Sequence, residues 1–339
     1  MRVLIRGGGV AACCAMRLLN RRGLSFSVEN APRPLLPAIL LGERTQSLIG
    51  DVFENASLLE RLPRIRQRIV KWGDNAETKI LPHEAVLVSE QALLERIQPG
   101  PTIGGNEEAG EPTWTICSSG PLREGSEQLE FGSRIANACQ VTLREGCERD
   151  ACWIESLDSG WLFLLPGRER GWLLSVGAAA EQLLAKSSLV AEQVLAADPA
   201  SGSFSSHPRI AERLCGPGWM ACGAAALGFD PLCGDGVGNA AREAILACAV
   251  TAAVAGGADE DSALEHYRVR LQAGFMRHLE ISQEFYRSGG SGPWWREQVE
   301  AAERGLEWCR SRLKGVTGFR YRLRGFSLEP ADTGRPELT

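Results

Sequence analysis

The stretch RVLIRGGGVAA, residues 2–12, decides the fold of this chain. Residues 2–5 form a short apolar run typical of a buried strand, and three glycines, residues 7–9, follow directly. A helix is expected over residues 13–19, and residues 25–28 form a second strand-like run that ends at Glu29. The order of strand, glycine turn, helix and strand predicts a βαβ unit with a dinucleotide-binding turn.

Each part of this unit has a physical task. Gly7 makes the tight turn, Gly9 lets the backbone approach a pyrophosphate, and Ala12 lets the helix pack closely on the strand. The helix N-terminus offers free N–H groups and the positive end of its dipole to the phosphates. Glu29 would accept ribose hydroxyls and repel a 2′-phosphate, so the ligand is expected to be FAD or NAD. The predicted contacts are Gly7, Gly9, Val10, Ala11, Ala12, Glu29 and Asn30.

Composition limits the other partners. The 339 residues carry a net charge of −5, which gives no electrostatic case for binding nucleic acid. The chain enters a strand at residue 2, so no signal peptide is expected. No uncharged apolar run reaches about 18 residues, so no membrane span is expected. We therefore predict a cytoplasmic protein.

The eleven cysteines do not form a disulfide or metal pattern. There is no C-x-x-C pair and no Cys/His group at zinc-ligand spacing, so no metal site is predicted. Cys13 and Cys14 are adjacent on an expected helix, and others lie in apolar runs. Buried free thiols are the prediction.

Periodicity predicts the remaining elements. Amphipathic helices are expected at 58–70 and 182–197, and a long helix rich in small residues at 237–254. Four consecutive strand-like runs predict an antiparallel meander, at 138–143, 152–156, 161–165 and 172–176. Trp219–Cys222 is expected to return as a strand to the parallel sheet. Beyond residue 261 the chain is expected to be helical, at 264–286 and 297–313, with a last strand at 320–326.

A second stretch identifies a family. Residues 223–240, GAAALGFDPLCGDGVGNA, resemble the flavin-contacting segment of the FAD-dependent monooxygenases and halogenases that share the p-hydroxybenzoate hydroxylase fold. Three more landmarks follow the family's order: Gly42-Glu43, Ser118-Ser119-Gly120, and WLFLLP at 161–166, which is similar to the halogenase Trp-x-Trp-x-Ile-Pro box. The resemblance implies FAD as the cofactor. It implies further contacts from Arg44, Gly223, Ala224, Asp230, Pro231, Gly234, Asp235, Gly236, Val237, Gly238 and Asn239.

The implied fold class is α/β: a Rossmann-like FAD-binding domain, an inserted antiparallel β-sheet substrate domain, and C-terminal helices. The expected FAD-binding domain is discontinuous and comprises 1–80, 88–120 and 210–260. The expected β-rich substrate domain comprises 81–87 and 121–209. The expected C-terminal helical region is 261–339.

The chain departs from the family at three places. Ala224 replaces an acid that contacts the ribityl chain. Asp235 stands where halogenases have small hydroxyl residues near a halide, and a carboxylate there would repel chloride. The halogenase catalytic lysine has no clear counterpart, since Lys71 is the only lysine beside arginines 64, 66 and 68. Halogenation is therefore the weaker alternative.

The resemblance implies an FAD-dependent monooxygenase that hydroxylates an aromatic substrate through a C4a-hydroperoxyflavin. The alternatives are a flavoprotein that modifies a Trp or another residue of a partner peptide or protein, a halogenase, and a non-catalytic flavin-binding protein. No catalytic residue is fixed, and Glu43 and Arg44 are the candidates near the isoalloxazine ring. The predicted substrate pocket comprises Trp161, Phe163, Trp294 and Trp295. Electrons would come from NAD(P)H or from an external flavin reductase.

Overall fold

A five-stranded, mostly parallel sheet carries the N-terminal βαβ unit. The computed structural model describes all residues except 32, 99–110, 121–125, 168–169, 317 and 332–339. β1 (Val3–Arg6) lies between β2 (Phe26–Glu29) and β6 (Trp114–Cys117), parallel to both. The expected strand near 219 is β16 (Trp219–Ala221), which runs parallel to β6 and carries the two-residue β15 (Cys215–Gly216) at its edge.

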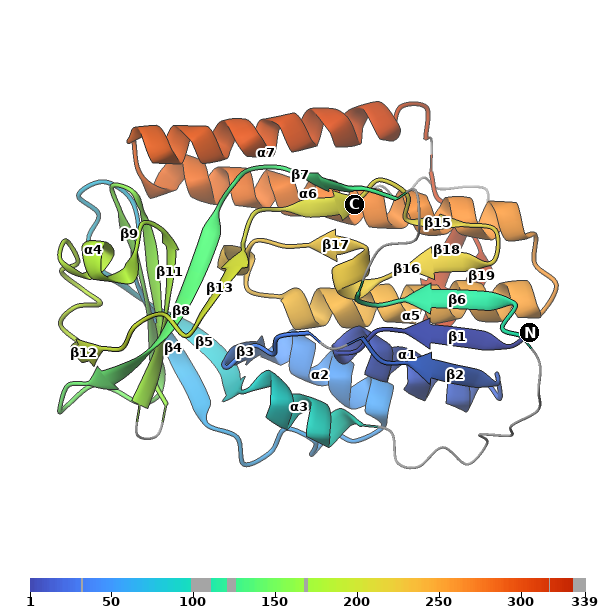
Figure 1. The fold of residues 1–339 in the computed structure, drawn as a ribbon, viewed down its shortest axis with the longest axis horizontal. Coiled ribbons are helices and arrows are strands. Elements are labelled where there is room, and N and C mark those ends of the chain that lie inside the picture. The colour runs from blue at the N-terminus through green and yellow to red at the C-terminus, as the bar shows by residue number, and fades with distance from the viewer. Residues whose placement is uncertain (32, 99–110, 121–125, 168–169, 317, 332–339) are drawn as a thin grey trace.

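Helices pack against this sheet because their small residues allow close approach. α1 (Val10–Arg21) buries eight residues from Val10 to Leu19, among them Ala11, Ala12 and Ala15. α5 (Gly236–Ala255) lies directly against α1 and is the long helix expected at 237–254. Two long antiparallel helices, α6 (Glu260–Gly289) and α7 (Pro293–Arg312), lie side by side along the long axis of the molecule (Figure 1). Residues 290–292, two of which are glycines, connect them, and Pro293 begins α7.

A second, mixed sheet of nine strands stands at one end of the molecule (Figure 1). Its order is β12-β8-β11-β10-β9-β4-β5-β3, with β13 beside β8. Only β4 and β9 are parallel neighbours. The strands are β3 (Ile39–Gly42), β4 (Arg64–Lys71), β5 (Lys79–Val88), β8 (Ile135–Leu143), β9 (Ala151–Leu157), β10 (Gly160–Leu165), β11 (Arg170–Gly177), β12 (Val194–Ala197) and β13 (Gly202–Ser205).

Short elements connect these layers. α2 (Glu43–Phe53) follows β3, and α3 (Glu90–Ile97) begins after Ser89, whose hydroxyl accepts from the Ala92 N–H as expected for an N-cap. The others are α4 (Ala180–Leu184), the 3₁₀ turns η1 (Gly223–Ala225) and η2 (Pro231–Cys233), a small sheet of β7 (Gln128–Glu130), β14 (Arg209–Ala211) and β17 (Leu227–Gly228), and a hairpin of β18 (Tyr321–Arg324) and β19 (Ser327–Pro330).

The nine-stranded sheet has two different faces, because side chains alternate along each strand. The outer face, with Ile69, Trp153 and Leu164, packs under Leu183 of α4. The inner face points toward the rest of the molecule. One part of it, around Trp161, is covered by α6 and α7. The other part comprises Ile65, Ala85, Leu87, Cys152 and Leu165.

The helix predicted at 58–70 is wrong: residues 64–71 form β4. Ile65 and Ile69 are four residues apart, which mimics a helical stripe. In the structure Ile65 lies on the inner face and Ile69 on the outer face, because a register shift between Ile65 and Gln67 reverses the alternation. A bulge in a strand and one helical turn give the same apolar spacing here.

The helix predicted at 182–197 is also wrong, because it ends at Leu184. The buried carboxylate of Glu155 accepts hydrogen bonds from the N–H groups of residues 188–190 and from the Ser187 hydroxyl. Burial alone would raise the pKa of Glu155, but these hydrogen bonds lower it below its ordinary value. The backbone after Leu184 is therefore shaped by a carboxylate on another strand.

The expected meander is only partly right. β9, β10 and β11 are consecutive neighbours, but β8 pairs with β11 and not with β9. The same sheet also includes β3 and β4, from segments that we assigned to the FAD-binding part. The division into domains remains a proposal.

All eleven cysteines are free, and nine of them are buried. Burial raises the pKa of the Cys248 thiol to about 12, so this thiol stays protonated.

The helix α5 bears on the expectation of no membrane span. Within the described residues, α5 is long and apolar enough to cross a membrane by length and composition. Of its most apolar 18-residue window, 61% is buried inside the protein against α1, α2 and α6. A core helix has the same properties, so α5 is weak evidence for a membrane span.

Candidate functional site

The glycine turn between β1 and α1 has the conformation that its residues predict. Gly7 and Gly9 have φ values of 112° and 85°, which favour glycine. A Cβ at Gly7 would lie 2.5 Å from the backbone nitrogen of Ser119. α1 begins at Val10 with no side-chain cap, so the N–H groups of its first turn are available to a ligand. This is the geometry of an anion-binding helix N-terminus.

Two segments far away in the sequence meet this turn. The Gly8 N–H donates to the Ser119 hydroxyl at 2.8 Å, which places the turn at 118–120 beside the glycines. A Cβ at Gly223 would lie 2.8 Å from the Cβ of Ala11. The segments at 7–12, 118–120 and 223–225 therefore form one surface, although more than a hundred residues separate each from the next.

The predicted ribose ligands lie at the end of β2. Glu29 is exposed and its Oε2 lies 3.1 Å from Nε of Arg6. Asn30 is exposed too. Both side chains can be reached by a ligand at the glycine turn.

Arg33 is a residue of this site that the sequence analysis missed. Its guanidinium would lie 2.5 Å from a Cβ at Gly9, so it covers the turn directly. The Glu90 carboxylate, 6% exposed, binds this guanidinium and also accepts from the Leu36 N–H at 2.9 Å. No local pattern links Arg33 with Glu90, because they are 57 residues apart.

The second predicted cofactor segment begins α5. Asp235 precedes the helix, and its side chain does not cap it, so the N–H groups of the first turn are again free of a side-chain cap. Oδ1 of Asp235 accepts from the Thr45 hydroxyl at 2.5 Å, and Arg242 pairs with its other oxygen. The charge of Asp235 is therefore offset by Arg242. The repulsion of chloride by this carboxylate is correspondingly weaker.

Glu243 lies beneath Gly223, on the second turn of α5. Its carboxyl is buried and accepts from the Gly223 N–H at 2.7 Å. Burial raises the pKa of Glu243 to about 8, against its hydrogen bond and the charge of Arg242. Ala224, where the family has an acid, is exposed. The acidic side chain beside Gly223 is therefore Glu243, which is buried behind the turn at 223–225. The exposed position of this turn, Ala224, carries no acid.

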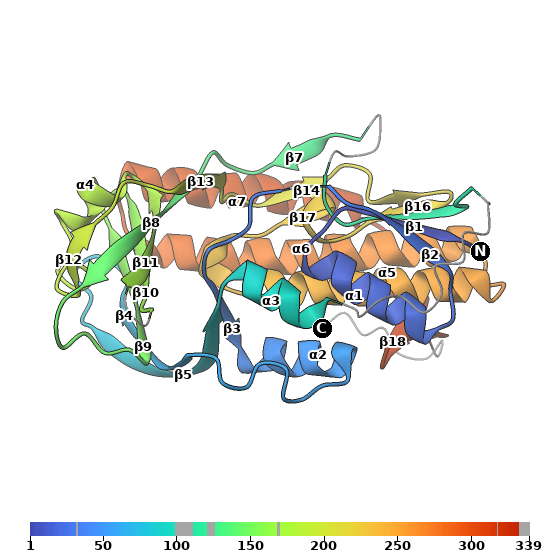
Figure 2. The same ribbon diagram turned by 60° about the horizontal axis from the view of Figure 1, so that its bottom comes forward.

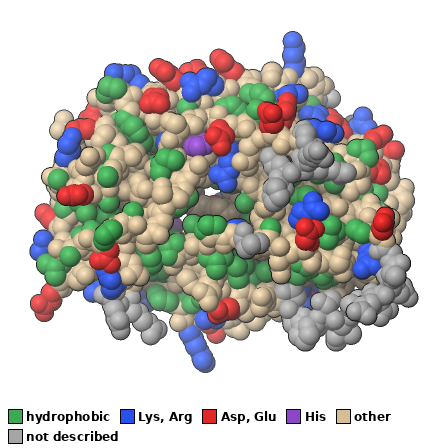
Figure 3. All heavy atoms as spheres, viewed as in Figure 1, with side chains coloured by type: hydrophobic (Ala, Val, Ile, Leu, Met, Phe, Trp, Pro, Cys, Tyr) green, Lys and Arg blue, Asp and Glu red, His purple; other side chains and the backbone are tan. Residues whose placement is uncertain are grey.

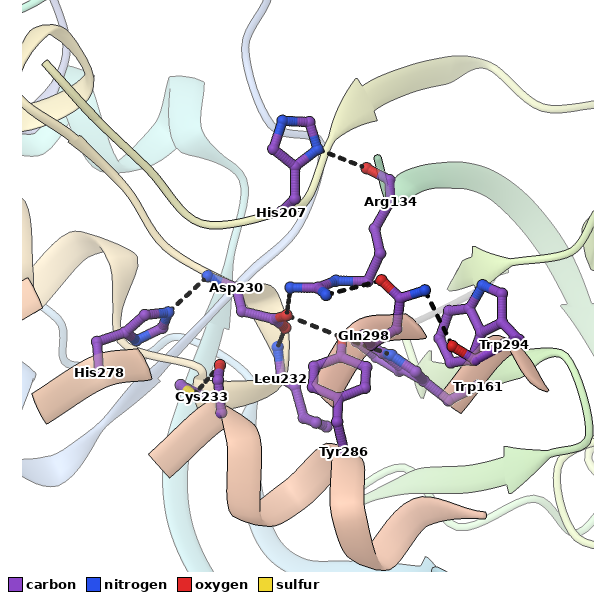
Figure 4. Close-up of polar contacts among 11 residues, drawn as sticks. Arg134, Trp161, His207, Asp230, Leu232, Cys233, His278, Tyr286, Trp294 and Gln298 are labelled. Atoms are coloured by element: carbon purple, nitrogen blue, oxygen red, sulfur yellow. Dashed lines mark hydrogen bonds and ion pairs between the residues drawn. The ribbon is translucent and has the colours of Figure 1, made fainter. Parts of the chain in front are cut away.

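Asp230 has a different environment from the one we predicted for a cofactor ligand (Figure 4). Its side chain is fully buried, and Oδ2 is 2.8 Å from both Nη2 of Arg134 and the Tyr286 hydroxyl. Oδ1 accepts from the Leu232 N–H at 2.8 Å. Arg134 also donates to Gln298 at 2.9 Å. Both carboxylate oxygens are therefore used within the protein.

The same network reaches α6 and the sheet (Figure 4). The Asp230 N–H donates to Nε2 of His278 at 3.0 Å. Burial lowers the pKa of His278 to about 4, so the imidazole is neutral and accepts this bond. Trp161 of β10 donates to the Tyr286 hydroxyl at 3.3 Å. The network fixes the Asp230-Pro231 segment by five side chains from outside it, namely Arg134, Trp161, His278, Tyr286 and Gln298.

The four aromatic residues predicted for a substrate pocket do not share one environment. Trp161 and Trp295 are 0% and 1% exposed and belong to a core cluster with Tyr286, so neither borders open space in this structure. Phe163 and Trp294 are half-buried. Phe163 also contacts the inner-face cluster of the sheet, which Trp161 does not.

Glu43 and Arg44 begin α2, after Gly42 at its N-cap position. Both side chains are exposed, and among the described residues neither forms a side-chain hydrogen bond or an ion pair. Lys71 points elsewhere: it is paired in register with Glu155 and donates to Ser188 at 2.6 Å, on the outer face of the sheet. It therefore points away from the inner face of the sheet.

A hollow lies in the middle of the face seen in Figure 3, between the nine-stranded sheet and the parallel sheet, with hydrophobic side chains along its lower rim. A separate depression of about 440 Å³ lies at the end of β4 and is lined by Val70, Trp72, Ala76, Glu77, Lys79 and Ser288. Among the described residues, no group of His, Cys, Asp or Glu has the arrangement of a metal site.

No protein-family model matches this chain, and no curated protein matches its sequence. Solved structures do match. The fold is that of FAD-dependent hydroxylases and halogenases, at sequence identities below 20%.

Three of these structures show how similar this chain is to known proteins of the fold. The peptidyl tryptophan dihydroxylase QhpG, essential for tryptophylquinone cofactor biogenesis, is 18% identical with a TM-score of 0.71, covering 97% of this chain and 86% of QhpG. The flavin-dependent halogenase CmlS is 17% identical with a TM-score of 0.70, covering 97% and 83%. Klebsiella pneumoniae HpxO, crystallised with FAD and uric acid, is 16% identical with a TM-score of 0.63, covering 94% and 98%.

Proposed function

We propose that this protein is an FAD-dependent monooxygenase that hydroxylates an aromatic substrate. Two observations carry the proposal: α1 and α5 both begin without a side-chain cap, and the start of α1 packs against Gly223. Two such ends suit a ligand with a pyrophosphate at one point and a polarisable ring at another. Enzymes of the same fold use FAD.

The residues present fit this cofactor. Gly7 and Gly9 keep side chains out of the turn, and the Arg33 guanidinium, which lies over Gly9, would pair with the pyrophosphate. Glu29 and Asn30 are placed to bind the ribose of the adenosine half. At the other end, the α5 N-terminus would stabilise negative charge on the ring edge. The substitution at Ala224 removes one contact to the ribityl chain.

When bound, FAD would supply the oxygen chemistry after reduction. The residues of the chain bind and orient the cofactor, and they exclude water from the ring. The Asp230 network holds Pro231 and the turn that follows it rigid, so the α5 N-terminus keeps its position. The inner face of the nine-stranded sheet, with half-buried Phe163, forms the opposite wall of the site.

Flavin titration tests the proposal. Purified protein should be yellow or should quench the fluorescence of added FAD, and Arg33→Met should weaken FAD binding about tenfold, because a charge-assisted contact to phosphate is lost. Arg64→Gln, an exposed arginine on β4, is the matched control and should bind FAD normally. A colourless protein that does not bind FAD would refute the proposal.

The source of electrons needs a separate measurement. Oxygen uptake is followed with NADH or NADPH alone, and again with an added flavin reductase. If oxygen uptake needs the reductase, a partner protein supplies the electrons. If uptake occurs without it, NADH or NADPH reduces the protein directly. Chloride dependence of product formation would indicate a halogenase, which the position of Lys71 on the outer face disfavours.

A peptide or protein substrate is the second candidate. QhpG, a peptidyl tryptophan dihydroxylase, has this fold over 97% of the present chain. The depression beside Trp72 offers additional surface at the end of β4, with Val70, Trp72 and Ala76 as its apolar lining. Trp oxidation in a co-expressed partner peptide, read by mass spectrometry, would favour this candidate over a small molecule. A flavin-binding protein without turnover would bind FAD but show no substrate-dependent oxygen uptake.

A further inference from the structure

Glu243 of α5 is a buried acid behind the surface that the proposed cofactor would cover. The residue is 6% exposed, and its Oε2 accepts from the Gly223 N–H at 2.7 Å. The same glycine packs against the start of α1, since a Cβ at Gly223 would lie 2.8 Å from the Cβ of Ala11 in the first helical turn. Gly223 therefore connects the Glu243 carboxyl with the helix end that would bind the pyrophosphate.

No cation pairs with this carboxyl in the part of the chain that the structure describes. The adjacent Arg242 is exposed and pairs with Asp235 at the start of the helix. An ionised carboxylate is costly in such surroundings, because it has left water without gaining a counterion. A pyrophosphate bound in front of Gly223 would raise this cost further, since like charges repel strongly across a protein interior.

Four buried thiols and one buried phenol lie around Glu243 and its neighbour Cys222. They are Cys14 of α1, Cys117 of β6, Cys222 itself after β16, Cys248 of α5 and Tyr267 of α6. Burial raises the pKa of Cys248 to about 12, and it raises the pKa values of Cys14, Cys222 and Tyr267 well above their ordinary values. Buried thiols and phenols of this kind stay neutral near pH 8. The pKa of Glu243 is raised to about 8, so this carboxyl changes its charge there.

We propose that Glu243 is a positioning residue of the cofactor site, and that its carboxylate takes up a proton when the protein binds the pyrophosphate of FAD. This inference rests on the proposed FAD-binding function. The neutral acid still accepts from the Gly223 N–H, so the turn at 223–225 keeps its place while the repulsion of the pyrophosphate is removed. Bound FAD therefore keeps Glu243 protonated to higher pH than in the free protein.

The pH dependence of FAD binding tests this role. Below pH 7 the acid is protonated in the free protein and in the complex, so the Kd of FAD should be constant. Between pH 7 and pH 9 the Kd should rise about five- to tenfold, because the free protein loses a proton that the complex keeps. Calorimetry at pH 8.5, in two buffers of different ionisation enthalpy, should show the uptake of about half a proton or more per FAD bound.

Glu243→Gln distinguishes proton uptake from a packing role. The amide is neutral at every pH, so this variant should bind FAD like the wild type at pH 7, about five- to tenfold more tightly than the wild type at pH 9, and without proton uptake. Loss of a packing contact alone would weaken binding equally at both pH values. Glu280→Gln, which changes an exposed acid on α6, is the matched control and should keep the wild-type pH profile.

ADP-ribose separates this inference from the proposed function, because it carries the adenosine diphosphate half of FAD without the flavin. Proton uptake with ADP-ribose in a protein that does not bind FAD would refute the flavin function and support the role of Glu243. An FAD affinity that is unchanged between pH 7 and pH 9, or the same pH profile in the wild type and Glu243→Gln, would overturn the role of Glu243 alone. Binding of neither ligand would overturn both.

Discussion

The glycine turn at 7–12 and the segment at 230–238 were both predicted to contact the same cofactor, yet they are built differently. The turn consists of backbone: positive φ values at two glycines and an uncapped helix. The second segment is held by buried side chains of Arg134, His278 and Tyr286. In the glycine turn the N–H groups at the helix start have no side-chain cap, whereas the polar groups of Asp230 are all bonded within the protein.

This difference predicts how the glycine turn and the Asp230 network respond to mutation. Changes in the glycine turn should alter ligand binding and leave the fold intact. Changes in the network around Asp230 should alter folding stability first, because they leave buried charges without partners. The following predictions test this contrast.

Asp230→Asn should have the largest effect. The substitution leaves the buried Arg134 guanidinium without its counterion, and we expect a loss of about 3–5 kcal/mol in the free energy of unfolding. Asp198→Asn is the matched control, since the Asp198–Arg170 pair is exposed and should contribute about 0–1 kcal/mol. Urea denaturation measures both. Similar losses in the two variants would contradict the structural role of the buried pair.

Glu243→Gln should change the pH dependence of stability. The pKa of Glu243 is about 8 in the folded protein and 4.5 in its ordinary state, so the folded state binds the extra proton. The stability associated with this proton is complete below pH 4.5 and is lost as the pH rises to about 8, with a slope of at most about 1.4 kcal/mol per pH unit.

Glutamine mimics the protonated acid and can still accept from Gly223. The variant should therefore match the wild type near pH 4.5 and exceed it near pH 8. Unfolding measured across this range checks the prediction, and parallel pH profiles of the two proteins would refute it.

Gly9→Ala should weaken FAD binding at least about tenfold. A Cβ at this position needs a strained backbone and collides with Arg33. At the neighbouring Gly8 the nearest atom to such a Cβ is 3.9 Å away, so Gly8→Ala should bind FAD almost normally. Fluorescence titration gives the two affinities. Thermal unfolding should show that both variants remain folded, in contrast to Asp230→Asn.

Lys71→Met should have the smallest effect. Lys71 donates to Ser188 on the outer face, away from the proposed flavin site. Substrate-dependent oxygen uptake should stay within about twofold of the wild type. A loss of activity with normal FAD binding would show that Lys71 reaches the chemistry and would revive the halogenase alternative.

The sequence by itself predicted the βαβ unit, the long helix α5 and the C-terminal helices. These features depend on local turn conformations and on periodicity within one element. Each is determined by residues a few positions apart.

Only the tertiary structure decided the rest. The bulge that turns an apparent helix into β4, the Glu155 carboxylate that ends α4, and the Arg33–Glu90 and Arg134–Asp230 pairs all join residues that are distant in the chain. A buried charge is stable only where a partner from another element meets it, and no local pattern records that partner.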